Sequence, residues 1–452
     1  DQIQPIWRNC TNPNAVQHQF QAPQVHTLKG LNLFPLPPFY DGKNIYRRRN
    51  QREIIMNINE ERVSGKHLGL DTSRLFVQYL SDKTSRVIKK IQIVPDETMV
   101  QPEIRAIMAH EGRGIVTLQD ELSGINEVLL SKSATRLMFN ESFQYIYRTD
   151  QTSHVREDLK VASIVLLFMT PVDTHALKIL WNCLRVDKED VMEVFVIVAA
   201  LLTCNYERTN KSSCLWELFK KLYVLILSSS WIVEPPECKS YEKLTRIPNL
   251  QGWLDRVSNF EICQFGCSTC LRSVLVHPRN YYACNLLRFL LSTCEDSGLK
   301  LHLIIQIIDF HNGEYDDYSL WMVVLDVCLD AKYRQMEYYR EQRKMIDGRE
   351  TTLPSLDVLR IYLKIKNCYT TSYGRFLTML KLHYEFGLGL ELETNLKNRV
   401  YSFEKAHGVV DIRKIEGPVN ISSDALLKEE YEKALNIKRA LCECQKNRKQ
   451  HS

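Results

Sequence analysis

The chain has 452 residues, of which 44% are hydrophobic and 25% are charged, proportions that exclude a chain disordered throughout. Its 59 basic and 54 acidic residues leave a formal net charge of +5, without the strong basic bias that by itself indicates nucleic-acid binding. The longest apolar run, Val194 to Leu202, is much shorter than the roughly 20 residues that cross a bilayer, so we expect a buried core helix there and no membrane partner.

Residues 1–40 are rich in Pro, Gln and Asn and show no helical period, so we expect an extended arm. The arm ends in NLFPLPPFY, and we expect Phe34, Phe39 and Tyr40 to lie against this domain or against a partner. Residues 41–150 predict a mainly helical part. In it, RLFVQYLSDKTSRVIKKIQIV predicts a helix running into a short strand, and AIMAHEGRGIVTLQDELSGINEVLL predicts a glycine turn followed by a helix.

From residue 151 to residue 452 apolar residues recur every three or four positions, which predicts a helical body that forms one continuous domain with residues 41–150. We predict helices over residues 155–169, 174–185, 188–204, 213–227, 250–257, 282–294, 299–309, 356–366, 374–385, 391–405 and 424–446. Asp173 and Asp187 stand where side-chain oxygens cap helix starts.

A further long helix is predicted over residues 319–345, apolar at first and then charged. We expect its second half to project or to line a groove, with Tyr333, Tyr338 and Tyr339 as candidate partner contacts. Helix lengths vary, and no repeat of fixed period is visible. The predicted fold class is therefore all-α: an irregular helical bundle or solenoid with an extended N-terminal arm.

The segment ICQFGCSTCLRSVLVHP holds Cys263, Cys267 and Cys270 at the C-x3-C-x2-C spacing of enzymes that combine an iron–sulfur cluster with S-adenosylmethionine. Those enzymes place the motif after the first strand of a parallel barrel, usually with an aromatic residue where this chain has Thr269. A zinc site would need His277 or Cys284 as its fourth ligand. We instead expect a turn between core helices, with the three cysteines as small apolar side chains and no metal or cofactor.

The chain holds 14 cysteines, most of them inside apolar runs such as LWNCL and VVLDVCLD. This distribution differs from the even spacing of small disulfide-stapled domains. We therefore expect reduced thiols and an intracellular protein.

The run KNIYRRRNQR concentrates basic side chains. Its members are Lys43, Arg47, Arg48, Arg49 and Arg52. Such a run can neutralise phosphates or serve in nuclear import, although it can also be a solvated surface.

The segment IQIVPDE places Ile91, Ile93 and Val94 just before two carboxylates. This is the make-up of a SUMO-interacting motif, which adds an extended strand to the edge of a sheet. The alternative is an ordinary strand inside the fold.

The sequence contains no G-x4-G-K-[ST], G-x-G-x2-G, H-E-x2-H or G-x-S-x-G pattern. We therefore expect no enzyme.

The polar arm leading into NLFPLPPFYDGKNIYRRRNQREIIMNINEER, the cysteine-bearing helical body and the closing LKEEYEKALNIKRALCECQKNRKQ resemble a known family over nearly the whole chain. The family comprises the C-terminal helical regions of vertebrate SUMO-interacting-motif-containing proteins that are similar to the Nse-five subunit. Because the sequence begins at Asp1 and not at Met, we expect it to be part of a longer protein.

The resemblance implies a non-catalytic all-α domain in a heterodimer with an Nse-six-like helical protein. The pair would direct the structural-maintenance-of-chromosomes five/six complex to SUMO-rich nuclear sites and viral replication centres, with nuclear localisation. The family's main SUMO-interacting motifs lie upstream of this domain, so IQIVPDE need not be one. The family has no catalytic signature that could be carried over residue by residue.

Three functions remain open at this point. A scaffold predicts a stoichiometric helical partner, with SUMO as a further partner. A nucleic-acid adaptor predicts salt-dependent DNA contact through the Lys43 to Arg52 patch. An enzyme would depend on the cysteine cluster and predicts bound metal.

Overall fold

The computed structural model describes residues 69–81, 89–99, 114–119, 126–148, 155–184, 188–228, 258–294, 296–311, 316–329, 355–388, 391–412 and 425–451. These residues form 16 helices and three strands, which confirms the predicted all-α class of irregular helical fold. The predicted arm over residues 1–40 lies outside the described residues. The chain divides into two compact units, an N-terminal unit that ends at Leu215 and a C-terminal unit that starts at Trp216. The single continuous domain expected from the sequence stays a prediction.

The N-terminal unit combines helices with one small sheet. Its elements are α3 (Asp71–Ser81), β1 (Lys89–Val94), α4 (Asp96–Met99), β2 (Ile115–Gln119), β3 (Asn126–Ser131), α6 (Lys132–Arg148), α7 (Arg156–Met169), α8 (Thr174–Cys183), α9 (Lys188–Leu202) and α10 (Glu207–Asn210). Helices α6, α7 and α9 pack around α3, and α9 also contacts β1.

The three strands have the order β1-β3-β2, with β1 parallel and β2 antiparallel to the central β3. The predicted passage from a helix into a short strand is confirmed by α3 and β1. The helix predicted after the glycine turn is wrong, because this stretch forms β2 and β3. Gly114 immediately precedes β2 with a φ of 72°, and the β-branched Ile115 and Val116 that follow favour an extended chain and are buried.

Helix α9 is a core helix, as the apolar run predicted. All nine residues from Val194 to Leu202 are at most 4% exposed. In the described part of the chain, no helix is long and apolar enough to cross a membrane.

The C-terminal unit is helical throughout its described residues. Its elements are α11 (Ser213–Ser228, which begins just before the unit boundary), α13 (Asn259–Val276), α14 (Tyr281–Thr293), α15 (Ser297–His311), α16 (Tyr318–Cys328), α19 (Ser355–Lys366), α20 (Tyr373–Phe386), α21 (Leu392–His407) and α22 (Ala425–His451).

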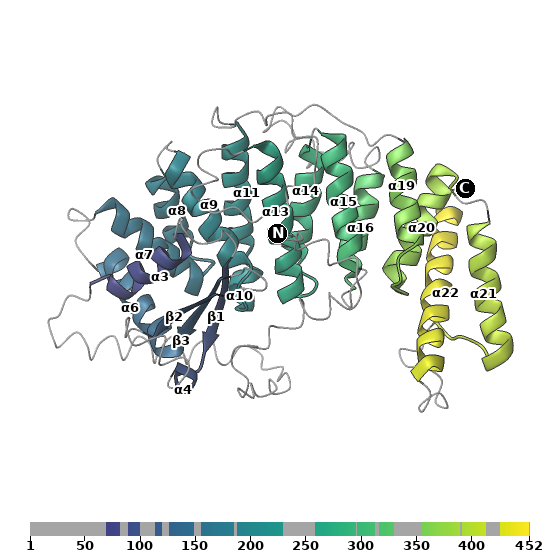
Figure 1. The fold of residues 1–452 in the computed structure, drawn as a ribbon, viewed down its shortest axis with the longest axis horizontal. Helices are drawn as coiled ribbons and strands as arrows, with labels where there is room; N and C mark the ends of the chain where they lie inside the picture. The colour runs from purple at the N-terminus through teal and green to yellow at the C-terminus, as the bar shows by residue number, and fades with distance from the viewer. Residues whose placement is uncertain are drawn as a thin grey trace, which may run out of the picture. The chain divides into compact units, whose positions relative to one another are not determined.

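Successive helices pair as α13 with α14, α15 with α16, α19 with α20 and α21 with α22. The first members α13, α15 and α19 contact one another in sequence, and the second members α14, α16, α20 and α22 do the same. Figure 1 shows these helices side by side. The unit is thus a two-layered stack of helix pairs, the general arrangement of a helical solenoid.

Two sequence expectations in this unit are wrong. The three cysteines do not lie in a turn but inside the 18-residue helix α13, which ends two residues before Pro278. The start of α13 is fixed by a capping box between Ser258 and Glu261. The long helix expected over 319–345 instead ends at Cys328, and Leu329 adopts a non-helical ψ of 20°. The apolar half of the predicted helix is thus buried as α16, while residues 330–345 lie outside the described residues.

Candidate interaction site

Most of the predicted contact residues fall outside the described residues. These are Phe34, Phe39, Tyr40, Lys43, Arg47, Arg48, Arg49, Arg52, Tyr333, Tyr338 and Tyr339. Their roles in partner or DNA binding stay predictions. The structure places the cysteine cluster and the proposed SUMO strand.

Cys263, Cys267 and Cys270 lie on one face of α13 and are at most 3% exposed. Burial raises the pKa of the Cys267 thiol to about 12 and that of Cys270 well above its ordinary value. Metals and clusters bind the thiolate, which this apolar setting disfavours. Within the described ranges, no group of three or more His, Cys, Asp or Glu side chains is placed to hold a metal ion.

The proposed SUMO strand is β1, which pairs with β3 along its whole length from Lys89 to Val94. Ile91 is fully buried, whereas Ile93 and Val94 are half-buried. The Ile91 carbonyl also accepts a hydrogen bond from Asn205 N at 3.3 Å. A SUMO-interacting motif pairs with the edge of another sheet. β1 is an edge strand of its own sheet, but Ile91 would have to give up its buried position and its bond with Asn205 to take part in such a contact. SUMO binding by this strand stays a prediction.

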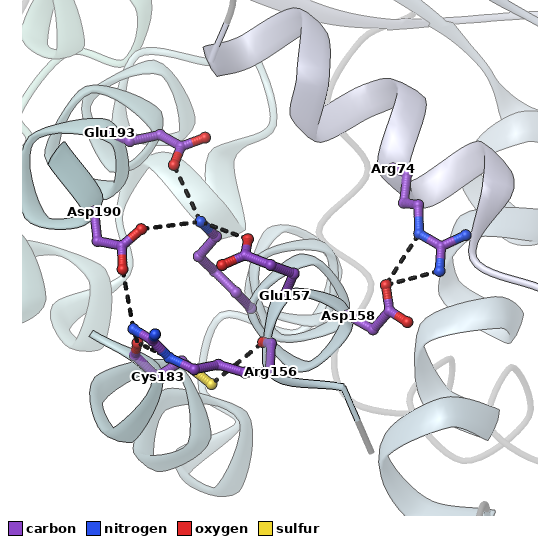
Figure 2. Close-up of polar contacts among 8 residues, drawn as sticks. Arg74, Arg156, Glu157, Asp158, Cys183, Asp190 and Glu193 are labelled. Atoms are coloured by element: carbon purple, nitrogen blue, oxygen red, sulfur yellow. Dashed lines mark hydrogen bonds and ion pairs between the residues drawn. The ribbon is translucent and has the colours of Figure 1, made fainter. Parts of the chain in front are cut away.

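A charged cluster lies at the start of α7 in the N-terminal unit (Figure 2). Lys160, whose side chain is 7% exposed, places Nζ 2.8 Å from Glu157 Oε2 in the same helix. The same nitrogen lies 3.1 Å from Glu193 Oε2 and 3.4 Å from Asp190 Oδ1, both in α9. Burial alone would lower the pKa of Lys160, but the hydrogen bonds and charges of Glu157 and Glu193 raise it. A catalytic amine needs a lowered pKa, so this arrangement joins α7 to α9 and does not supply a base.

The same turn of α7 reaches two more helices, as Figure 2 shows. Arg156 Nη2 lies 2.9 Å from Asp190 Oδ2, and Arg156 Nε donates to Cys183 O, the last carbonyl of α8, at 2.8 Å. Arg74 of α3 donates through Nε and Nη2 to Asp158 Oδ1, at 3.0 and 2.8 Å. The cluster therefore fixes α3, α8 and α9 around α7, which is a structural role.

A group of exposed tyrosines lies in the C-terminal unit, where α14, α16 and α20 each begin with a tyrosine. Asp317, the cap of α16, accepts a hydrogen bond from Arg279 N just before α14, at 2.8 Å. Farther along, Arg288 Nε of α14 donates to Asp326 Oδ2 of α16 at 2.5 Å. The two helices are therefore parallel and in register.

Tyr318 of α16 stacks on Tyr373 of α20, with ring centroids 5.7 Å apart and planes 14° apart. Tyr281 and its neighbour Tyr282 meet edge to face at 6.1 Å. Tyr281 is 66% exposed, Tyr282 40% and Tyr318 46%. We call these four residues, Tyr281, Tyr282, Tyr318 and Tyr373, the tyrosine edge.

Asp317 holds the tyrosine edge in place. Its carboxylate accepts hydrogen bonds from Ser319 N at 2.7 Å, which caps α16, and from Arg279 N at 2.8 Å. Arg279 has a φ of 60°, a strained value for a residue with a side chain, and the bond to Asp317 stabilises it. The Asp317 carbonyl also lies 3.2 Å from Nε2 of the buried His311. One residue thus fixes the turn before α14 and the start of α16.

The sequence analysis missed this surface, although a signal was present. Each of the three helices starts with a capping residue followed by tyrosine, as Asn280-Tyr281, Asp317-Tyr318 and Ser372-Tyr373. The cap side chains accept hydrogen bonds from backbone N–H groups of their own helices. Caps at corresponding positions bring the tyrosines to one end of the stack.

Comparison with known proteins gives one family match. A family model described as the ECM9 middle domain matches residues 215–348, less than a third of the chain. These residues include α11 from Leu215 onward and all of α13 to α16, and with them Tyr281, Tyr282 and Tyr318 of the tyrosine edge. No curated protein matches the chain. Over residues 215–348 the chain is thus similar to the ECM9 middle domain.

Proposed function

We propose that this protein is a non-catalytic scaffold that binds another helical protein through the tyrosine edge. The observation that carries the proposal is that three parallel helices each begin with a tyrosine at one end of the stack, and that Tyr281, Tyr282 and Tyr318 are exposed there while Tyr373 is half-buried. Tyrosine supplies a large contact area with little side-chain entropy to lose, and its hydroxyl group forms hydrogen bonds at the rim of an interface. The stack holds the helix starts rigidly, so the tyrosines need little rearrangement on binding.

The sequence resemblance extends this proposal to a particular partner. We propose that the partner is an Nse-six-like helical protein, and that the heterodimer recruits the structural-maintenance-of-chromosomes five/six complex to SUMO-rich nuclear sites and viral replication centres. The all-helical class expected of the family agrees with the observed fold. A nuclear location and a contact with SUMO belong to the same proposal.

The test is co-purification with an Nse-six-like protein, followed by light scattering and titration. We expect a stoichiometric complex that weakens at least about tenfold in the triple variant Y281A/Y282A/Y318A. Tyr401→Ala is the matched control, because Tyr401 lies on α21 and is also 66% exposed. If no complex forms, the proposed partner is wrong. If the complex forms with the same affinity in the triple variant as in the wild type, the tyrosine edge is not its contact surface.

A nucleic-acid adaptor is the alternative function, and it is favoured by the basic run in KNIYRRRNQR. Replacing Arg47, Arg48 and Arg49 by alanine should then weaken DNA binding at all sequences and flatten its salt dependence. Unchanged binding would rule out this function for the patch. The tyrosine-edge variant should leave DNA binding as it is.

A further inference from the structure

A row of leucines on α19 faces away from the core. Leu356 is 60% exposed, Leu359 36% and Leu363 45%. Their spacing of three and four residues places them on one side of the helix, over two turns. We call these three residues the leucine stripe.

The opposite side of α19 already packs against the unit. Its buried residues include Val358, Ile361, Tyr362 and Ile365. A helix that covers one face of a core normally presents polar residues on the other, so a second apolar face indicates a second contact. The stripe has the width of one helix.

The position of α19 is fixed at two points. Lys364 Nζ lies 2.6 Å from Asp309 Oδ1 of α15. The buried Arg375 of α20 donates to Ile365 O at 2.9 Å and to Lys366 O at 2.7 Å, which satisfies the last carbonyls of α19. The stripe is therefore ordered before any partner binds, which lowers the entropic cost of binding.

Basic side chains lie on both sides of the stripe. Arg360 is on one side and Lys366 on the other at 100° per residue, and both are exposed. Arg360 also pairs with Asp357 of the same helix at 3.3 Å, and Lys364 pairs with Asp309 of α15. The three basic residues of α19 and these two carboxylates leave a charge of +1. An apolar seam with flanking charges selects a partner helix of opposite charge, as in paired helices.

The same charges argue against other occupants. A second copy of the chain would bring two basic rows together, which is unfavourable. Residues 330–354, which precede α19, carry six basic and five acidic residues and so offer no acidic excess. Charge complementarity thus favours a different, acidic chain.

We propose that the leucine stripe binds an acidic amphipathic helix of a partner protein. Apolar side chains of that helix pack on the leucines, and its carboxylates meet Arg360 and Lys366. The inference goes beyond the scaffold proposal because it names the partner's chemistry and uses another helix than the tyrosine edge.

The test uses two designed helical peptides of about 21 residues, long enough to form a helix on the surface. Both carry the same leucine seam, one with glutamates and one with lysines beside it. We expect the full chain to bind the glutamate peptide at least about tenfold more tightly, with weaker binding as salt rises from about 50 to about 300 mM. Equal binding of the two peptides, or no binding, would overturn the proposal.

Variants of exposed residues locate the binding. L359D/L363D should bind the glutamate peptide at least about tenfold more weakly than the wild type. R360E/K366E should bind the lysine peptide more tightly than the glutamate peptide. Val409→Asp is the control, since Val409 is 79% exposed in the same unit. The triple tyrosine variant should bind the peptide like the wild type, so the two proposals fail separately.

The remaining outcomes decide between occupants. If the peptide binds only after residues 330–354 are deleted, that segment covers the stripe and the proposal is wrong. If light scattering shows a dimer that L359D/L363D converts to a monomer, the occupant is a second copy. If L359D/L363D binds the glutamate peptide as tightly as the wild type does, the proposal is contradicted as well.

Discussion

The two compact units join their helices by different chemistry. In the N-terminal unit, a network of ionised side chains around Lys160 links α7 to its neighbours. In the C-terminal unit, parallel helices are joined by caps such as Asp317 and by single pairs such as Arg288 with Asp326. Parallel stacking aligns the helix starts, so one cap can serve two helices and the ends remain open for tyrosines.

The largest expected effect is that of Lys160→Met, which tests whether the charged network holds the helices of the N-terminal unit together. Removal of the ammonium group takes this partner from Glu157 and Glu193 and leaves Asp190 with Arg156, and we expect a loss of about 3 kcal/mol of unfolding free energy. Urea denaturation followed by circular dichroism measures it. Lys211→Met is the control, because the exposed Lys211–Glu207 pair on α10 should contribute less than about 0.5 kcal/mol. Equal losses in the two variants would show that the cluster does not hold the unit together.

The next effect concerns the cap shared by two helices. We expect Asp317→Ala to cost about 2 kcal/mol, since both Ser319 N and Arg279 N lose their acceptor. Asp317→Asn keeps one acceptor oxygen and should cost about half as much. The same denaturation experiment gives both values. A cost for alanine no larger than for asparagine would mean that the second bond contributes nothing.

Sequence periodicity predicted most helices of the C-terminal unit within a few residues, because each has one apolar and one polar side. It missed α13, in which ten consecutive residues from Ile262 to Leu271 are buried, so no polar face marks the period. Sequence periodicity also missed β2 and β3, which are five and six residues long. The central strand β3 pairs with both β1 and β2, and this pairing stabilises it without an alternation of apolar and polar residues in its sequence.

The tyrosine edge shows a different limit of prediction from the sequence. The cap and tyrosine at the start of each helix can be seen in the sequence, but Tyr318 follows Tyr281 by 37 residues and precedes Tyr373 by 55. No fixed period connects these positions. Only the packing of α14, α16 and α20 brings them together, and the leucine stripe likewise becomes visible only when the buried face of α19 is known.

A smaller effect tests the thiols that fill the C-terminal core. We expect Cys267→Ala to cost about 1 kcal/mol, the loss of one small apolar group at a fully packed position. Metal analysis of protein purified without chelator should give the same result for wild type and variant. Cys442→Ala on α22, where the cysteine is only half-buried, is the control. Stoichiometric zinc or iron that disappears with Cys267 would overturn our interpretation of α13.

The smallest effect concerns an ion pair of the C-terminal unit, and it depends on pH. Glu404 Oε1 of α21 lies 2.6 Å from Lys438 Nζ of α22 and accepts from Val410 N at 2.9 Å. Burial alone would raise the pKa of Glu404, but the hydrogen bond from Lys438, the bond from Val410 N and the lysine charge lower it below its ordinary 4.5. The unfolded state therefore takes up the proton first, so this stabilisation is complete above pH 4.5 and is lost as the pH falls through the folded-state pKa.

Glu404→Gln should accordingly cost about 0.5 kcal/mol at neutral pH, and the difference from the wild type should shrink as the pH falls below about 4.5. Glu207→Gln is the control, since the Glu207 side chain is 61% exposed and pairs with Lys211 at the end of α10. Urea denaturation at a series of pH values measures the difference. A gap between Glu404→Gln and the wild type that stays constant down to pH 3 would mean that the pair with Lys438 is not what joins α21 to α22. A cost as large as that of Lys160→Met would remove the contrast between single pairs in one unit and a network in the other.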